Sequence, residues 1–279
     1  MRLGAVARAL MADRSPESSQ PEALFAAAAA LGLDEFELPT RGWDEPGSRF
    51  VERVRDLQQR HGVGVSLNFG DDYVKHGADQ PTDRFETFVT QLCRPLGARV
   101  VGTVSPSHGG RWLKDPPLSL QLERLTAALR RLAPVAEQHG VKLAVENHAD
   151  YRGHELASVL ERAGSPAVGA KLDTGNALAA VEDATDAAQA LAPFTFATHV
   201  KDVRVESEPG NRGMELRGLC VMQEVALGEG HVDFPTVLAL LTQHGPLGND
   251  LVLTIEEGAR TIAGSVDYAR RHFGAYLSA

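Results

Sequence analysis

Four apolar segments in the second half of the chain each end in a side chain that could bind a metal ion or exchange a proton. The segments are VKLAVE ending at Glu146, VGAKLD at Asp173, FTFATH at His199 and LVLTIE at Glu256. An apolar run of this length is typical of a buried strand. A carboxylate or imidazole at its tip is either solvated by chance or placed against a metal or a substrate. The elements that carry these tips decide between the two interpretations.

Eight short apolar runs alternate with longer helical patterns along the chain. The runs cover residues 3–7, 34–39, 63–69, 98–104, 141–147, 168–173, 194–200 and 250–256, and the helical patterns cover 20–31, 47–61, 82–94, 118–139, 153–163, 183–191, 233–244 and 261–276. Eight strand–helix units in series predict an α/β fold, a single (β/α)8 TIM barrel over residues 1–279. The alternative, an open doubly wound sheet, favours a glycine fingerprint after the first strand, and LGAVARAL has none.

The carboxyl ends of all strands in such a barrel meet at one rim. Four consecutive strands would therefore bring Glu146, Asp173, His199 and Glu256 together. Three carboxylates and one imidazole make an oxygen-rich donor set, which suits Mn²⁺ best, with Mg²⁺, Co²⁺ or Zn²⁺ as alternatives. Carboxylates pressed together repel one another, and a divalent cation is the natural compensation.

The overall composition narrows the class of partner. The 279 residues carry 28 Lys and Arg against 37 Asp and Glu, a formal net charge of −9. Such a surface repels nucleic acids and anionic membranes, so we expect a small-molecule, sugar-like substrate. The N-terminus does not read as a signal peptide, and no apolar stretch approaches a membrane span. The two cysteines lie far apart, which indicates a reducing compartment. We therefore expect a cytoplasmic protein.

Five motifs in the second half resemble the xylose isomerase-like TIM barrel superfamily, the sugar phosphate isomerase/epimerase group. They are LAVENH (143–148), KLDTGNAL (171–178), THVKD (198–202), ALGEGHVDF (226–234) and LTIEEG (253–258). By this resemblance, Glu146, Asp173, His199 and Glu256 would be the metal ligands. Glu146 and Glu256 would also flank the substrate and exchange protons with it. Related barrels further suggest a homodimer.

The implied chemistry is proton transfer next to a carbonyl. The metal would stabilise an enediolate while one carboxylate removes a proton and the other returns one from the opposite face. The leading hypothesis is a sugar isomerase or epimerase acting on a ketose, keto-sugar or cyclitol. A metal-dependent lyase, such as a keto-cyclitol or dehydroshikimate-type dehydratase or a 3-keto-glycoside-eliminating enzyme, is the alternative, and a non-catalytic ligand-binding barrel is the third. The nuclease branch of the superfamily typically has His where this chain has Asn176, and the acidic surface also argues against DNA.

Further polar residues near the predicted strand ends could contact the substrate. They are His148, Lys201, Asn176, Asn68 and His108, and each has an ordinary structural interpretation as a loop or capping residue. Residues 202–228 form a long segment after the seventh strand, rich in glycine and charge. We interpret it as a loop that serves either as a lid over the site or as a subunit contact.

Overall fold

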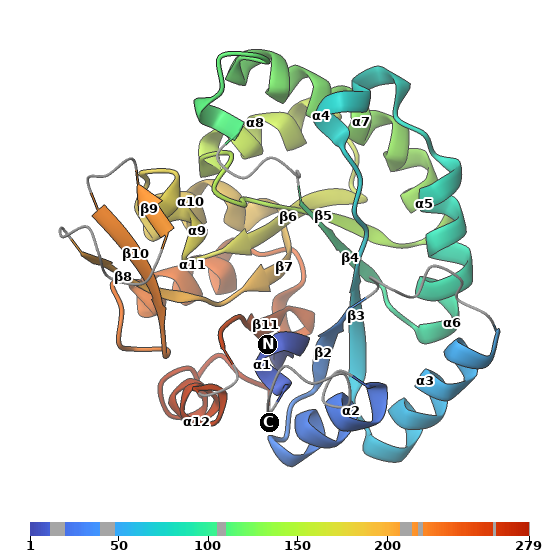
Figure 1. Cartoon of the computed structure of the whole chain (residues 1–279), viewed down its shortest axis with the longest axis vertical. Coiled ribbons are helices and arrows are strands. Elements are labelled where there is room, and N and C mark those ends of the chain that lie inside the picture. Colours follow the sequence, from blue (N-terminus) through green and yellow to red (C-terminus); the bar gives the residue numbers. More distant parts are fainter. Residues whose placement is uncertain are drawn as a thin grey trace.

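A computed structural model describes residues 1–11, 20–39, 48–104, 110–206, 214–216, 220–258 and 261–278. Its central sheet has eight parallel strands in the order β11-β1-β2-β3-β4-β5-β6-β7 (Figure 1). Their bounds are β1 Arg2–Val6, β2 Glu35–Leu38, β3 Gly64–Asn68, β4 Val100–Thr103, β5 Lys142–Glu146, β6 Val168–Asp173, β7 Thr195–His199 and β11 Val252–Ile255. A parallel bridge between Val200 and Ile255, next to a 2.7 Å hydrogen bond from Val200 N–H to the Thr254 carbonyl, joins β7 to β11. The predicted barrel is confirmed.

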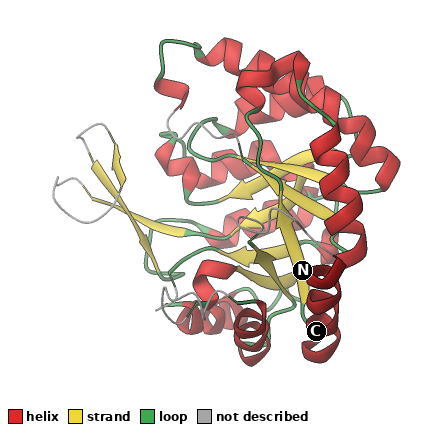
Figure 2. Ribbon diagram, turned by 45° about the vertical axis from the view of Figure 1, so that its right-hand side comes forward, coloured by secondary structure: helices red, strands yellow, loops and turns green. Residues whose placement is uncertain are grey.

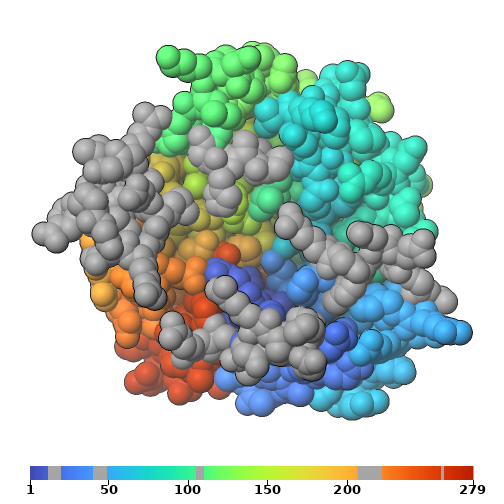
Figure 3. Space-filling model, viewed as in Figure 1, coloured from blue at the N-terminus to red at the C-terminus, as the bar shows by residue number. Residues whose placement is uncertain are grey.

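Helices cover the outside of the barrel. The α-helices of the described residues are α1 Ala7–Leu10, α2 Pro21–Ala30, α3 Ser48–His61, α4 Tyr73–His76, α5 Asp83–Phe88, α6 Arg94–Leu96, α7 Leu118–His139, α8 Gly153–Ala163, α9 Asn176–Ala179, α10 Ala184–Leu191, α11 Phe234–His244 and α12 Ile262–His272. Successive units follow one another around the molecule, so that the first and last lie side by side (Figure 3). No helix among the described residues is both long enough and apolar enough to cross a bilayer.

The predicted strands and helices lie within a few residues of the observed ones, with two exceptions. The helix expected over 82–94 is interrupted by a π-helical segment at Val89–Cys93, and α6 then carries it on to Leu96. The helix expected over 261–276 ends at His272. Short 3-10 segments at Gly77–Asp79, Gly110–Trp112, Ala192–Phe194 and Gly248–Asp250 complete the helical elements.

The interior of the barrel is hollow at its amino-terminal end. Barrels of this kind normally fill this space with bulky branched side chains. Here small residues such as Gly64, Ser66, Gly102 and Ala197 line a cavity of about 640 Å³. Lys171 also lines this cavity, and it is only 2% exposed. The main apolar core lies instead between the strands and the surrounding helices.

The segment predicted to be a long loop, 202–228, instead contains a small antiparallel sheet. Its strands are β8 Asp202–Glu206, β9 Met214–Leu216 and β10 Cys220–Val225, in the order β8-β10-β9. The sheet extends away from the barrel (Figure 2). Val203 and Met222 pack against Ala149 and Ala179 in an apolar cluster separate from the main core. The loop prediction was wrong because it relied on the glycines and charges of the segment. The alternation of apolar and polar residues in DVRVE (202–206) is typical of a strand.

Asp202 shapes the return of this segment to the barrel. Its carboxylate accepts hydrogen bonds from the backbone N–H groups of Gly228 (2.9 Å), Gly230 (2.8 Å) and Val232 (3.2 Å). A Cβ atom at Gly230 would lie 2.1 Å from the Asp202 carboxylate, so this position excludes a side chain. The sheet is thereby fixed at the rim that also carries the predicted ligands.

Candidate metal centre

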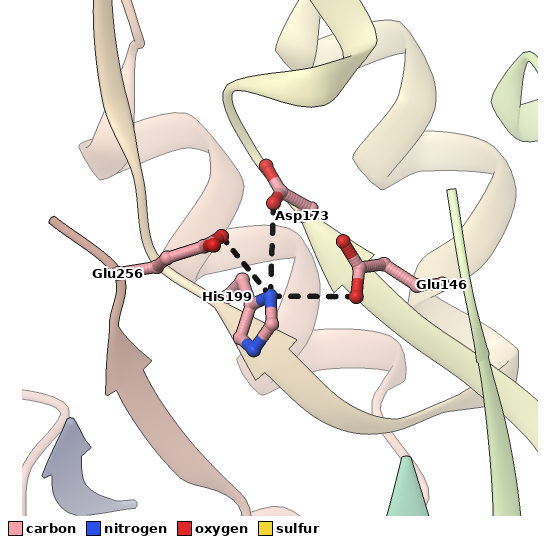
Figure 4. Close-up of side chains that lie close together, drawn as sticks. All are labelled: Glu146, Asp173, His199 and Glu256. Atoms are coloured by element: carbon pink, nitrogen blue, oxygen red, sulfur yellow. Dashed lines mark ion pairs between the residues drawn. The ribbon is translucent and has the colours of Figure 1, made fainter. Parts of the chain in front are cut away.

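The side chains of Glu146, Asp173, His199 and Glu256 converge on one point, and each can offer a donor atom within 4.8 Å of the others. Nδ1 of the imidazole lies at the centre of the group (Figure 4). It is 3.1 Å from Glu256 Oε2, 3.4 Å from Glu146 Oε2 and 3.7 Å from Asp173 Oδ2. The sequence therefore identified four residues that the fold does bring together.

Strand register explains why these side chains meet. Glu146 pairs with Lys171 between β5 and β6, and Asp173 pairs with His199 between β6 and β7. Glu256 directly follows β11. The next residue, Glu257, is buried away from the cluster and accepts a 2.7 Å hydrogen bond from the Ser265 hydroxyl on α12. The structure thus separates the adjacent glutamates, and it is Glu256 that faces the rim.

Asp173 serves two purposes at once. Its Oδ1 accepts hydrogen bonds from the N–H groups of Gly175 (2.9 Å) and Asn176 (2.8 Å), as expected of a turn-forming residue. Its Oδ2 remains directed at the cluster. Asn147 clamps the same residue from the neighbouring strand, since its amide accepts from Asp173 N–H (2.8 Å) and donates to the Asp173 carbonyl (2.9 Å). These bonds hold the carboxylate in one orientation.

Two of the weaker predicted residues also contact the cluster. Nδ2 of Asn176 donates to Glu146 Oε1 (3.1 Å) and to Asp173 Oδ2 (2.8 Å). Lys201 Nζ lies 2.8 Å from Asp173 Oδ2 and 2.7 Å from Glu256 Oε2. Its ammonium group therefore bridges two of the carboxylates. The pKa of Lys201 is raised, because these carboxylates outweigh the burial that would lower it.

The structure describes two of the three remaining predicted contacts, Asn68 and His148. Asn68 lies deeper in the barrel, where its Oδ1 is 3.2 Å from Lys171 Nζ. His148 is half-buried in the loop after β5. His108 lies outside the described residues. The structure thus connects Asn176 and Lys201 directly to the cluster and Asn68 through Lys171.

Sequence reasoning missed two charged residues inside the barrel, Glu37 on β2 and Lys171 on β6. Glu37 Oε2 is 2.6 Å from Lys171 Nζ and 3.0 Å from His199 Nε2. Lys171 Nζ is also 3.7 Å from Glu146 Oε2. A signal was present, because Lys171 interrupts an otherwise apolar, fully buried strand and shares the inward face with Asp173, two residues later.

Arg8 connects the cluster to the antiparallel sheet. Its guanidinium lies 3.1 Å from Glu256 Oε1 and 2.7 Å from Glu224 Oε2 on β10. The pKa of Arg8 is raised, because Glu256 and Glu224 outweigh the effect of burial. Glu256 is therefore held by three groups from two parts of the chain: Arg8 after β1, and His199 and Lys201 at the end of β7.

The charges of the site fit a divalent cation. Four carboxylates, from Glu37, Glu146, Asp173 and Glu256, lie against two ammonium groups, from Lys171 and Lys201. The charges of Arg8 and Glu224 cancel each other, so with His199 neutral two negative charges remain. Among the described residues, Nδ1 of His199 has no hydrogen-bond partner of acceptable geometry, although it is buried. A dication at this point would balance the charge and give that nitrogen a partner.

In the metal-free protein, a proton on His199 balances part of the negative charge of the surrounding carboxylates. Burial and Lys171 lower the pKa of His199, but Glu256, Glu146 and Glu37 outweigh them, and the pKa lies well above 6.5. Burial raises the pKa of Glu146 and of Glu256, yet His199 and the nearby lysines leave both below 4.5. The two glutamates are therefore ionised at neutral pH.

A family model described as the xylose isomerase-like TIM barrel matches residues 25–272. The chain belongs to this family. The resemblance noted in the sequence motifs is thereby confirmed, and it extends to the first half of the barrel.

Two proteins similar to this xylose isomerase-like barrel are named as a decarboxylase and as a 3-epimerase. The chain is 28% identical over 184 residues to the 3-oxo-isoapionate decarboxylase of Pectobacterium atrosepticum, a match that covers 66% of the chain and 58% of that protein. Among solved structures, it resembles an L-ribulose 3-epimerase with a TM-score of 0.66 and 21% identity, over 99% of the chain and 94% of the epimerase. At this identity the structural likeness supports the fold alone.

Two further structures of the same fold contain metal ions. One is a xylose isomerase-like TIM barrel protein from Mycobacterium smegmatis in complex with magnesium, with a TM-score of 0.67 and 16% identity over 99% of this chain and 98% of that one. The other is the IOLI protein with a zinc atom, with a TM-score of 0.67 and 18% identity over the full length of both chains. Neither ion is manganese, so the metal preference of this xylose isomerase-like barrel stays a prediction.

Proposed function

We propose that this protein is a divalent-metal-dependent isomerase or epimerase that transfers a proton at a carbon next to the carbonyl of a ketose, keto-sugar or cyclitol. The observation that carries the proposal is the placement of Glu146 and Glu256 on two sides of His199 Nδ1. A sugar bound over the cluster would have one carboxylate near each face. That is the arrangement required to remove a proton on one side and return it on the other.

The proposed ligands are Glu146, Asp173, His199 and Glu256, and Mn²⁺ is the proposed ion. The bound ion would polarise the carbonyl and stabilise the negative charge of the enediolate. The chain itself supplies the proton transfers. Glu146 and Glu256 are ionised before substrate binds, so either can accept the proton. Lys201 and Asn176 are placed to donate hydrogen bonds to substrate oxygens once the metal compensates the carboxylates they now contact.

A lyase is the second candidate, supported by the decarboxylase relative. Loss of CO2 from a 3-oxo acid breaks the bond between the carboxylate carbon and C2 and leaves an enolate, which a single protonation at C2 converts to the ketone. Lys201 and Arg8 supply cations beside Glu256 that suit a carboxylate substrate. Dehydration or elimination would use one of the two carboxylates, or His148, to protonate the departing oxygen.

Proton exchange in heavy water tests the proposal. The protein is loaded with Mn²⁺, incubated with pools of ketoses, inososes, 3-keto-glycosides and 3-oxo acids, and the carbons next to the carbonyl are followed by NMR after removal of the metal. Metal-dependent deuterium incorporation with a rearranged sugar supports the isomerase or epimerase. A new double bond or released CO2 supports the lyase. A protein that binds no metal and exchanges no proton contradicts both and favours a non-catalytic ligand-binding barrel.

A further inference from the structure

Glu37 connects the imidazole of His199 to a lysine inside the barrel. Its Oε2 lies 3.0 Å from His199 Nε2 and 2.6 Å from Lys171 Nζ. These three residues come from β2, β7 and β6. The contact is on the side of the ring opposite to the four-residue cluster, since Nδ1 is the atom that faces the other carboxylates.

We propose that Glu37 and Lys171 are positioning residues that fix the tautomer and orientation of His199, an inference that rests on the proposed metal-dependent function. A carboxylate only accepts hydrogen bonds, so Nε2 must carry the proton that it shares with Glu37. In the neutral ring, Nδ1 then keeps its lone pair, directed at the point where the donors converge. A second hydrogen bond of this kind orients a metal-binding histidine and raises its basicity.

Lys171 holds Glu37 in place. Its ammonium group has three donors, and it lies 2.6 Å from Glu37 Oε2, 3.2 Å from Asn68 Oδ1 and 3.7 Å from Glu146 Oε2. Gly102 makes room for this arrangement, because a Cβ atom there would lie 2.0 Å from Asn68 Oδ1 and 3.1 Å from Lys171 Nζ. The lysine thereby contacts both the carboxylate that holds His199 and a carboxylate of the cluster.

Packing does not explain this ion pair. Lys171 is 2% exposed, and burying a charge costs free energy that its partner offsets only in part. The space beneath it is a cavity of about 640 Å³ rather than a close-packed core. Two apolar or neutral residues of similar volume would serve the barrel as well or better. The pair is therefore placed for its effect on His199.

The test uses Glu37→Gln, Lys171→Met and the double variant. The double variant removes one positive and one negative charge, so the net charge of the site stays the same and the barrel should unfold at close to the wild-type urea concentration. Glu35→Gln is the matched control, because Glu35 lies on the same strand and lines the same cavity but pairs with Arg2 at 3.2 Å. Mn²⁺ affinity is measured by calorimetry. The tautomer of His199 is read from ring-nitrogen NMR shifts of the Zn²⁺-loaded protein and of the metal-free protein at alkaline pH.

We expect Glu37→Gln and the double variant to bind Mn²⁺ roughly 10- to 100-fold more weakly than wild type, while Glu35→Gln stays within about threefold. In the Zn²⁺-loaded wild type the ring-nitrogen shifts should report Nδ1 as the ligated nitrogen. In the metal-free protein at alkaline pH they should report a proton on Nε2 in wild type and a mixture of tautomers in both Glu37 variants. A double variant with wild-type affinity and tautomer would overturn the proposal and leave the pair a structural feature. If wild type binds no Mn²⁺, the metal-dependent function fails, and the metal-free tautomers still decide the positioning role.

Discussion

Glu146 and Glu256 face each other across the imidazole of His199, with their Oε2 atoms 3.4 and 3.1 Å from the same nitrogen. They come from β5 and from the residue after β11, so the barrel brings together two carboxylates that are far apart in the chain. This geometry leads to a direct test of the two-glutamate mechanism.

Glu256→Gln should keep the shape of the site but remove one of the two bases. We expect proton exchange to fall by a factor of about 10² to 10⁴, while part of the metal affinity remains. The measurement is deuterium incorporation by the Mn²⁺-loaded variant, together with its metal content. Glu257→Gln is the control, since that neighbouring carboxylate faces Ser265 rather than the cluster. Normal turnover in Glu256→Gln would exclude the mechanism.

Lys201→Met should destabilise the metal-free protein more than the metal-bound one. Lys201 is the cation between Asp173 and Glu256, at 2.8 and 2.7 Å, and its loss leaves the buried carboxylate of Asp173 facing the half-buried carboxylate of Glu256. We expect the free energy of unfolding to fall by about 3 kcal/mol in EDTA and by clearly less with Mn²⁺. Urea denaturation under both conditions measures this. Lys142→Met, which removes a lysine at the far end of β5, provides the comparison, and an equal loss with and without metal would contradict the prediction.

Metal affinity should rise with pH. The pKa of His199 lies well above 6.5 in the metal-free protein, because the surrounding carboxylates outweigh burial and Lys171. Metal binding requires the neutral ring, so at any pH below that pKa the imidazole must release one proton when the metal binds. We expect the logarithm of the Mn²⁺ association constant to increase by about one per pH unit between roughly pH 5.5 and 7. Calorimetry across this range in two buffers of different ionisation enthalpy also counts the released proton. A flat profile would show that His199 is already neutral.

Glu257→Gln should change how stability depends on pH. Burial raises the pKa of Glu257 to about 7, even though the Ser265 hydrogen bond lowers it. The ordinary value is 4.5, so between these two pH values the folded protein holds a proton that the unfolded chain has released. The wild-type free energy of unfolding therefore loses about 2–3 kcal/mol from this group as pH rises through that window.

The Glu257→Gln variant lacks this pH-dependent contribution to the free energy of unfolding. Its stability relative to wild type should consequently increase from pH 5 to pH 8, when both are measured by urea denaturation in EDTA. A constant difference between the two proteins at all pH values would mean that Glu257 titrates normally.

The barrel and its four converging side chains could be predicted from the sequence because both depend on local patterns. Each strand is an apolar run of fixed length, and β6 was predicted at its observed bounds, Val168–Asp173. A ligand at a strand end reaches the rim whatever the detailed register. Knowing the fold class was therefore enough to predict that these four side chains lie close together.

Glu37 and Lys171 could not be predicted in the same way. They are 134 residues apart, and their contact depends on the stagger of β2 against β6 across the barrel. Glu37 and His199 are 162 residues apart. The inward direction of each side chain follows from strand alternation, but the level at which it lies inside the barrel follows from the shear of the whole sheet. The sequence alone does not provide that quantity.

The antiparallel sheet contacts the barrel through a small apolar cluster separate from the main core, in which Val203 and Met222 pack against Ala149 and Ala179. A part of a protein with so little shared core can open without unfolding the rest. The parts of the sheet away from Asp202 and Glu224 can accordingly be changed with only a small effect on the barrel. The sheet thus offers evolution and protein engineers a place to alter the surroundings of the rim, as long as the contact of Arg8 with Glu224 and Glu256 is kept.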